Sequence, residues 1–344
     1  MIRVLLVDDS ALYRKLLVRA LRTCSDIEIV GEAVDGQDAL AKIAILQPDV
    51  ITLDMNMPRM NGMETLAVLS VKYPMIKTII VAAETRDDAE RVVQVLEAGA
   101  IDVVLKPRAS VSEPVKTLTN ELGEKIRAAA GRMHSSYRGV NVSRPSRSFR
   151  RFRPDIVVIG SSTGGPAALY DVLTVLSADF PFPIVVVQHM PKLFVESLAR
   201  RLDQDTRLKC CVAKDGEGLK AGHIYFSPGE QHLMIEQNAP GKLVVRLDDG
   251  AAVHHCKPAV DVTLRSLHKL AGRVKTLTVI LTGMGVDGAA GAAALSEAGG
   301  KVIAQDRQSS VVWGMPGETV KLGAADEVLA LDQIGDAIKR ICCG

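Results

Sequence analysis

Short apolar runs rich in β-branched residues alternate with longer amphipathic stretches along the first 130 residues. The short runs predict buried strands, and the longer stretches, with apolar positions three or four apart, predict helices. The expected strands cover residues 3–7, 27–33, 49–53, 78–83 and 101–105, and the expected helices cover residues 11–22, 36–46, 62–72, 86–97 and 111–130. Strand–helix units in such succession predict a parallel sheet with helices on both faces.

A second α/β pattern starts near residue 154. The expected strands cover residues 156–159, 183–187, 211–213, 223–227, 233–236, 243–247, 277–281, 301–305 and 327–331. The expected helices cover residues 167–176, 193–202, 261–270, 289–298 and 332–341. This pattern predicts a second, doubly wound α/β sheet.

The two patterns are joined by a basic stretch. Residues 131–153 contain seven Arg, five Ser and no acidic residue, with no apolar period. We interpret them as a flexible connector, which places the domains at residues 1–122 and 154–344, with a helix end and linker at 123–153. A basic tether could also dock on an acidic protein partner.

Composition narrows the class of protein. The 344 residues are 47% hydrophobic and 24% charged, with a net charge of +2 and only 3% aromatic residues. These values are typical of a globular protein and give no support for nucleic-acid binding. The start MIRVLLVDD lacks an apolar h-region and a cleavage site, so we expect no signal peptide. No apolar run reaches the roughly 18 residues of a membrane span. Six cysteines without a C-x-x-C spacing suggest reduced thiols, so we expect a cytoplasmic protein without membrane insertion.

Charged residues gather where the strands of the first domain end. Asp8 and Asp9 follow one predicted strand, Asp54 follows another, and Lys106 follows a third. Carboxyl ends of parallel strands share one edge of a sheet, so these carboxylates should meet there, where oxygen ligands suit Mg²⁺. A carboxylate beside Mg²⁺ and a lysine is suited to accept a phosphoryl group. The alternative for any one aspartate is a helix cap.

The same residues carry a resemblance. The motifs L-L-V-D-D-S, T-L-D-M-N-M-P-x-M-N-G-M and L-K-P make residues 1–122 similar to a two-component receiver domain, which implies a flavodoxin-like fold with five parallel strands. The resemblance implies that Asp54 accepts phosphate from a histidine kinase and that Lys106 contacts the phosphoryl group. It also implies that Asp9 and Asp54 bind Mg²⁺ directly, that Asp8 assists, and that the Asn56 carbonyl coordinates the ion.

Two positions depart from the receiver pattern. Ala82 stands where the fourth strand normally ends in Thr or Ser, and Val103 stands where a switch aromatic is often found. Phosphorylation should survive because the metal ligands and the nucleophile remain. How the signal leaves the phosphorylation site is left open, and Thr85 in the following loop is not assumed to substitute.

A serine-containing turn follows the first strand of the second domain. Residues 160–164 fit the pattern G-x-S-x-G around Ser162, and a helical pattern follows. Such a turn can hold a nucleophile, although a phosphate cradle at the helix N-terminus is the competing interpretation. The stretch is neither G-x-G-x-x-G nor a Walker loop, which weakens the phosphate alternative.

Two further candidates follow other predicted strands. His189 and Asp287 should lie on the same sheet edge as Ser162, as a serine, its base and an orienting carboxylate require. The Met284 N–H, in a glycine-rich turn, is the candidate oxyanion donor. The competing interpretations are that His189 makes an ordinary polar contact and that Asp287 caps the helix starting near residue 289. The run 254–256, His-His-Cys, lacks the spaced partner pair of a metal site.

A second resemblance covers the rest of the chain from about residue 156. The motifs I-G-S-S-T-G-G-P, V-V-V-Q-H-M-P, L-T-G-M-G-x-D-G-A-A-G and S-S-V-V-W-G-M-P are similar to the catalytic domain of the chemotaxis protein-glutamate methylesterase family, CheB. The resemblance implies Ser162 as nucleophile, His189 as general base and acid, Asp287 as orienting carboxylate and the Met284 N–H as oxyanion donor. Ser161 stands where the family often has Ala, a small change that should be tolerated.

The two domains in this order imply a regulated enzyme. The family removes methyl esters from glutamates of methyl-accepting chemotaxis receptors, deamidates certain receptor glutamines, and receives phosphate from a chemotaxis histidine kinase. Its esterase reaction needs no cofactor, and the unphosphorylated receiver is expected to cover the active site. Two rival hypotheses are another hydrolase, such as a serine peptidase, and a receiver-linked interaction protein with little esterase activity.

Overall fold

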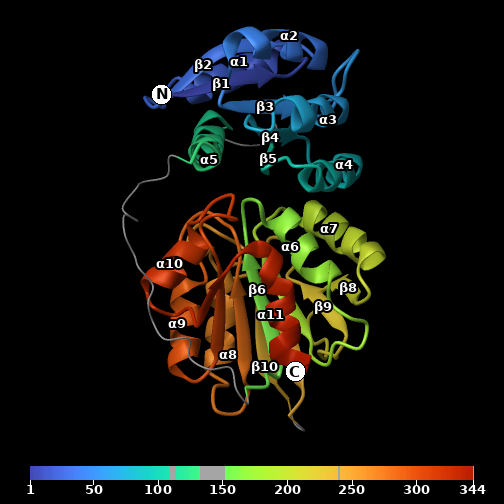
Figure 1. Cartoon of the computed structure of the whole chain (residues 1–344), viewed down its shortest axis with the longest axis vertical. Helices are drawn as coiled ribbons and strands as arrows, with labels where there is room; N and C mark the ends of the chain where they lie inside the picture. The colour runs from blue at the N-terminus through green and yellow to red at the C-terminus, as the bar shows by residue number, and fades with distance from the viewer. Residues whose placement is uncertain (108–113, 132–151, 239–240, 344) are drawn as a thin grey trace. The chain divides into compact units, whose positions relative to one another are not determined.

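The computed structural model describes residues 1–107, 114–131, 152–238 and 241–343 (Figure 1). The chain divides into two compact units, Met1–Ser136 and Tyr137–Gly344, which we describe separately. Most of the basic stretch assigned to the connector, residues 132–151, lies outside the described residues. Among the helices of the described ranges, none is long and apolar enough to cross a membrane.

The first unit is a five-stranded parallel sheet with the strand order β2-β1-β3-β4-β5. Its strands are β1 (Ile2–Val7), β2 (Ile27–Ala33), β3 (Val50–Asp54), β4 (Lys77–Ala82) and β5 (Asp102–Leu105). Its helices are α1 (Ala11–Leu21), α2 (Gly36–Leu46), α3 (Gly62–Lys72), α4 (Arg86–Glu97) and α5 (Pro114–Ala129). The sequence predicted this fold, and no observed strand bound differs from the expected one by more than one residue.

Register within this sheet explains why its acidic residues meet. Strands β1 and β3 pair with Val7 opposite Leu53, so the residues that follow, Asp8 and Asp54, leave the sheet side by side. The central strands β1 and β3 are mostly apolar and, apart from Arg3, buried, as expected of a sheet with helices on both faces. The packing of these strands in the core therefore places Asp8 and Asp54 at the same level of the carboxyl edge of the sheet.

The second unit contains a seven-stranded parallel sheet with the order β14-β13-β12-β6-β7-β9-β8. Its strands are β6 (Ile156–Ser161), β7 (Ile184–Gln188), β8 (Lys209–Val212), β9 (His223–Phe226), β12 (Thr276–Ile280), β13 (Lys301–Gln305) and β14 (Glu327–Leu329). The order reverses between β6 and β12, because β7 follows β6 on one side and β12 and β13 lie on the other. Ligands of such sheets bind outside the carboxyl ends at this switch point.

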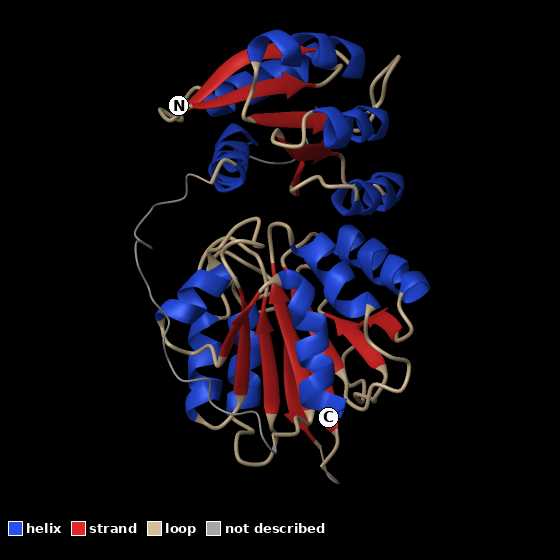
Figure 2. Cartoon of the chain, viewed as in Figure 1, coloured by secondary structure: helices blue, strands red, loops and turns tan. Residues whose placement is uncertain are grey.

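Helices cover both faces of this sheet (Figure 2). They are α6 (Gly165–Thr174), α7 (Lys192–Asp205), α8 (Val260–His268), α9 (Ala289–Glu297), α10 (Met315–Lys321) and α11 (Leu331–Cys343). Helix α11 lies in front of the sheet in Figure 1 and packs on α6, where Gly335 fits against Val172. Leu264 of α8 shares a buried cluster with Val158 and Val187 of the sheet.

Three expectations about this unit were incomplete or wrong. The strands β10 (His232–Gln237) and β11 (Leu243–Asp248) form a separate antiparallel pair rather than part of the main sheet. Helix α10 was not expected, because seven residues with an internal glycine are too short to display a helical period. Strand β14 ends at Leu329, two residues earlier than expected, and α11 begins at Leu331.

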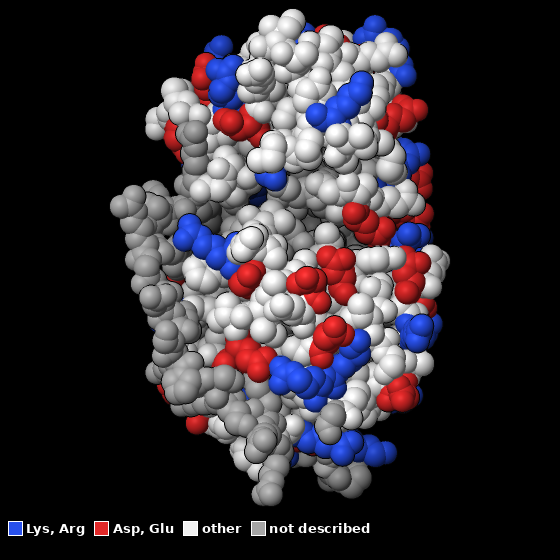
Figure 3. Space-filling view, in the orientation of Figure 1, with Lys and Arg blue, Asp and Glu red and all other residues white. Residues whose placement is uncertain are grey.

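Surface charge is mixed on both units. In Figure 3 the Lys and Arg side chains are interspersed with Asp and Glu on the visible face of each. This agrees with the net charge of +2 for the whole chain. The visible faces therefore give no large field of one sign that would steer a polyanion.

Candidate functional site

The serine turn and the His189 loop are locked together at the carboxyl edge of the second sheet. Strands β6 and β7 pair with Ser161 opposite Gln188, and the His189 N–H donates to the Ser161 carbonyl at 3.0 Å. The Ser162 N–H donates to the Thr282 carbonyl, also at 3.0 Å, which ties the turn to the loop after β12. The predicted convergence of these loops on one sheet edge is therefore present.

His189 and Asp287 form a close pair. The Nε2 atom of His189 lies 2.8 Å from Oδ2 of Asp287, with side chains 11% and 2% exposed. Burial disfavours the imidazolium, but the hydrogen bond to Asp287 and a contact with the Cys256 thiol outweigh it and raise the pKa of His189 to about 9. Burial likewise opposes the carboxylate of Asp287, yet the His189 hydrogen bond and backbone donors lower its pKa. The pair favours a charged carboxylate that fixes the imidazole tautomer.

Asp287 does not cap the helix that follows it. That helix, α9, has Gly288 at its N-cap without a side-chain bond. Instead Asp287 accepts the N–H of Val260 on Oδ2 at 2.7 Å and the N–H of Asp261 on Oδ1 at 3.0 Å, both from the first turn of α8. The competing interpretation of Asp287 as the cap of α9 was therefore wrong, and the partial positive charge of the α8 N-terminus stabilises the carboxylate.

Gln188 connects the two loops through its side chain. Its Nε2 donates to the carbonyls of Ser162 at 2.9 Å and His189 at 3.1 Å, and its Oε1 accepts from the Ser161 hydroxyl at 2.6 Å. All of these groups lie at the end of β6 or β7, and the Gln188 side chain is buried. The sequence showed Gln188 only as a residue after an apolar strand, which gave no signal of this role.

The turn that carries the expected oxyanion donor, Met284, approaches the serine at Gly283. The backbone of Gly283 approaches Ser162 so closely that a Cβ added there would stand 2.9 Å from the Ser162 Cβ. Gly283 itself is held by Gly314 and Met315, whose N–H groups donate to its carbonyl at 3.1 and 2.9 Å. Among the hydrogen bonds of the described residues, none uses the N–H of Met284, which leaves it available to a ligand.

Ser162 and His189 are neighbours without a direct bond. No hydrogen bond between their side chains occurs among the described residues, although the backbones around them are linked. Because Nε2 of His189 pairs with Asp287, the serine proton would have to pass to Nδ1. Catalytic hydrogen bonds are often long before substrate binds, so this geometry keeps Ser162 as a candidate.

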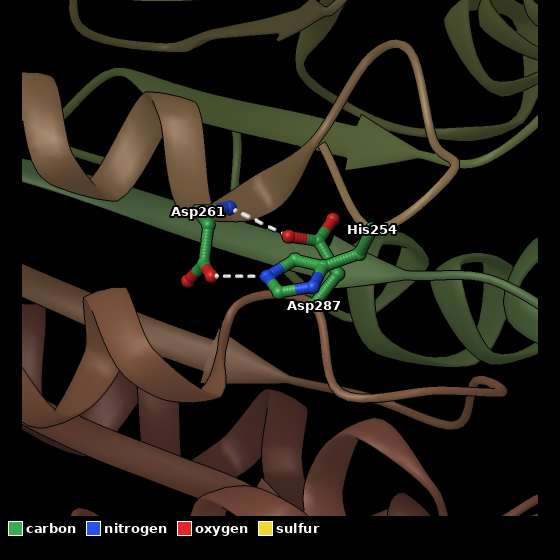
Figure 4. Close-up of side chains that lie close together, drawn as sticks. All are labelled: His254, Asp261 and Asp287. Atoms are coloured by element: carbon green, nitrogen blue, oxygen red, sulfur yellow. Dashed lines mark hydrogen bonds and ion pairs between the residues drawn. The ribbon is translucent and has the colours of Figure 1, made fainter. Parts of the chain in front are cut away.

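A second histidine–aspartate pair lies next to the first (Figure 4). Nε2 of His254 lies 2.9 Å from Oδ2 of Asp261, and the candidate ligand atoms of His254, Asp261 and Asp287 all lie within 4.8 Å of one another. His254 lacks the spaced sequence partner expected of a metal ligand, and Asp261 had no predicted role. The signal that could have found Asp261 is a carboxylate in the first turn of an expected helix.

This cluster is already filled by donors from the protein. Each oxygen of Asp287 accepts a backbone N–H, and its Oδ2 also pairs with His189. Oδ1 of Asp261 accepts the Gly291 N–H, and its Oδ2 faces His254 and Arg265. The arrangement is that of a hydrogen-bond network with satisfied acceptors.

The acidic residues of the first unit converge as expected. Oxygens of Asp8, Asp9 and Asp54 lie within 4.8 Å of one another, and Lys106 Nζ lies 2.9 Å from both Asp8 and Asp54. Burial raises the pKa of Asp54, and Lys106 opposes that shift. Burial disfavours the charge of Lys106, but the two carboxylates raise its pKa above the ordinary value.

Three carboxylates in this geometry fit a divalent cation. Asp8 and Asp54 are buried and Asp9 is exposed, so a cation would keep open positions toward solvent. The side chain of Asn56 turns away toward α4, where Nδ2 donates to Asp88 at 2.9 Å and Oδ1 accepts from Arg91 at 2.7 Å. The Asn56 carbonyl expected to coordinate the cation would therefore be that of its backbone.

The departures at Ala82 and Val103 lie in the core of the first unit. Ala82 ends β4 and Val103 lies in β5, both buried. Thr85 caps α4, because its hydroxyl accepts the Asp88 N–H at 3.1 Å and donates to the Asp88 carboxylate at 2.9 Å. The Thr85 hydroxyl is thus used in capping α4, and we do not assign it the role of the missing hydroxyl at Ala82.

Comparison with known proteins identifies the family of both units of the chain. A family model described as CheB methylesterase matches residues 157–338, and one described as response regulator receiver domain matches residues 4–113. The chain belongs to the CheB methylesterase family. Its first unit is therefore a receiver domain and its second a methylesterase domain, as the sequence motifs indicated.

Relatives match nearly the full length of the chain. Proteins from Symbiobacterium thermophilum and Thermotoga maritima, both named protein-glutamate methylesterase/protein-glutamine glutaminase, are 41% and 42% identical to it. Each alignment covers 98% of this chain, with 96% and 97% of the relative. The solved methylesterase catalytic domain of Thermotoga maritima CheB is 45% identical and covers 55% of this chain and 98% of its own, with a TM-score of 0.52.

Proposed function

We propose that the chain is a phosphorylation-regulated protein-glutamate methylesterase that also deamidates protein glutamine. The observation that carries the proposal is the His189–Asp287 pair beside Ser162, in a chain whose full-length relatives bear that name. Its substrates are methylated glutamates of methyl-accepting chemotaxis receptors, and its phosphodonor is a chemotaxis histidine kinase. It acts in the cytoplasm, without inserting into the membrane or binding nucleic acid.

The esterase reaction follows from three side chains. Ser162 Oγ attacks the ester carbonyl carbon, and His189 takes the hydroxyl proton. The bond to the methoxy oxygen then breaks, the proton passes from His189 to that oxygen, and methanol leaves. Water attacks the acyl-enzyme by the same route and restores Ser162 with a free glutamate. Asp287 holds the imidazole and stabilises its charged form.

The oxyanion is held by the backbone. The carbonyl oxygen of the substrate gains negative charge when Ser162 attacks, and its donor would be the N–H of Met284, which no hydrogen bond of the described residues uses. A glutamine side chain takes the same course, with ammonia leaving in place of methanol. The esterase reaction needs no metal for any of these steps.

Regulation begins at Asp54. The Asp54 carboxylate receives the phosphoryl group, and Lys106, 2.9 Å away, pairs with the phosphoryl oxygens. Asp8, Asp9, Asp54 and the Asn56 carbonyl would hold Mg²⁺, which supplies charge neutralisation for the transferred group. Phosphorylation then shifts the population between a less active and a more active state of the protein.

The proposal is tested by methanol release from membranes that carry methylated receptors. The wild-type chain should release methanol, and Ser162→Ala should release none while remaining folded by circular dichroism. Cleavage of a generic peptide instead of the methyl ester would favour a serine peptidase. Equal release by the wild type and Ser162→Ala, or none by either, would contradict the assignment and favour an interaction protein.

A further inference from the structure

Helices α8 and α9 both begin without a cap of their own. The N-cap residues, Ala259 and Gly288, make no side-chain hydrogen bond to the helices that follow them. The first N–H groups of a helix have no partner within the helix and need an acceptor when they are buried. Both helix starts lie in the methylesterase domain, where α8 and α9 pack against each other.

Each helix receives its cap from the other. Asp287, just before α9, accepts the N–H groups of Val260 and Asp261 at 2.7 and 3.0 Å, both from α8. Asp261, in the first turn of α8, accepts the N–H of Gly291 in the first turn of α9 at 2.7 Å. The two aspartates therefore exchange caps between the helices, and moving one of them displaces the helix that carries the other.

The exchange brings two buried carboxylates together. The candidate ligand oxygens of Asp261 and Asp287 lie within 4.8 Å of one another. Two carboxylates this close repel each other when charged, which disfavours their ionisation unless a donor offsets the repulsion. His254 and Arg265 supply such donors to Asp261. Nε2 of His254 lies 2.9 Å and Nη2 of Arg265 lies 3.4 Å from Oδ2 of Asp261. His254 adopts a left-handed φ of 52° in a two-residue turn, a conformation that costs free energy for a residue other than glycine.

We propose that Asp261 is a positioning residue for the esterase reaction, and that His254 holds Asp261 in place. The proposal rests on the function proposed for Ser162, His189 and Asp287. Asp261 touches neither substrate nor the reacting atoms. It acts through its backbone N–H on Asp287, which Figure 4 shows, and through its cap on α9. In this way it sets where Asp287 meets the imidazole of His189.

The test compares two substitutions of Asp261 in the full-length chain. Asp261→Ala removes the cap of α9, so kcat for methanol release should fall about 10-fold or more with KM unchanged, because small displacements of reacting groups are costly. Asp261→Asn keeps an oxygen for the Gly291 N–H and should retain kcat within about 3-fold. The low-field proton resonance of the His189–Asp287 hydrogen bond should shift in Asp261→Ala and persist in Asp261→Asn.

Asp326 provides a matched control. It is a buried carboxylate that accepts the Val302 N–H at 2.9 Å and pairs with Lys301, at the opposite edge of the same sheet. Asp326→Ala should lower the melting temperature but leave kcat and the resonance unchanged. Loss of kcat in both alanine variants in proportion to their loss of stability would overturn the positioning role.

Two outcomes remain decisive if a variant or the assay fails. Should Asp261→Ala not fold, His254→Ala, at a partly exposed side chain, should lower kcat and shift the same resonance. An unchanged kcat and resonance in every folded variant would refute the proposal. If the wild type releases no methanol, the proposed function fails, but the resonance still shows whether Asp261 positions the His189–Asp287 pair.

Discussion

An imidazole that serves as a base has to be neutral before it can take a proton from serine. At His189 the hydrogen bond to Asp287 and the contact with Cys256 outweigh burial and raise the pKa to about 9. Above that pKa the ring is neutral and available to Ser162. Below it most molecules carry an imidazolium that cannot accept the proton.

The pH profile of methanol release should therefore rise toward alkaline pH. We expect kcat/KM in the free enzyme to increase through an apparent pKa above the usual 6.5 of histidine. Cys256→Ala removes one of the groups that raise the pKa of His189, so the rising limb should move to lower pH. Rate measurements between pH 5 and 10 decide this, and a limb that stays fixed or moves upward in Cys256→Ala would contradict it.

At the scale of elements, the ends of β6 and β7 act as one unit because Gln188 bonds across them. Gln188→Met keeps a similar volume but removes the donors to the Ser162 and His189 carbonyls and the acceptor of the Ser161 hydroxyl. We expect a loss of about 1–3 kcal/mol in the free energy of unfolding, since buried polar groups lose their partners. Because both loops are released, kcat should fall about 10-fold or more.

Ser161→Ala is the control for that variant. It removes only the hydroxyl that donates to Gln188, and leaves the two bonds that hold the loops. Denaturant unfolding and methanol release should therefore show a smaller loss of kcat than in Gln188→Met. An equal or larger loss of kcat in Ser161→Ala would mean that Gln188 does not hold the two loops.

The same elements show how far sequence reasoning reaches. The strands and the residues at their ends were predictable, because apolar periodicity locates a strand and parallel sheets gather strand ends at one edge. The hydrogen-bond partners of the residues at the strand ends were not predictable. Asp287 caps α8, which begins 27 residues earlier in the chain, and Asp261 caps α9. Such exchanges depend on how two helices pack, which no local pattern encodes.

Short or isolated elements were the other gap. Helix α10 has seven residues, with Pro316 near its start and Gly323 just after its end as boundary signals. Strands β10 and β11 are short, partly apolar runs that nothing local distinguishes from strands of the main sheet. Tertiary pairing alone decides which sheet a short apolar strand joins. These gaps did not affect the candidate site of the second unit, whose residues follow the fully buried strands β6, β7 and β12.

For the whole molecule, the central question is how a phosphoryl group on the receiver domain changes the esterase. Asp54, Lys106 and the carboxylates around them form a site fit for phosphorylation, but Ala82 offers a methyl group where a hydroxyl is usual. Val103 likewise replaces an aromatic side chain. We expect phosphorylation to proceed and the coupling to travel by another route than a hydroxyl–aromatic switch.

The measurement that tests this account most directly is methanol release from methylated receptor membranes, with and without a small phosphodonor and Mg²⁺. The wild type should release methanol faster with the phosphodonor, whereas Asp54→Asn should keep the basal rate and not respond, because its amide cannot accept the phosphoryl group. Activation of Asp54→Asn by the phosphodonor, or a wild-type rate that does not change with it, would contradict regulation through Asp54.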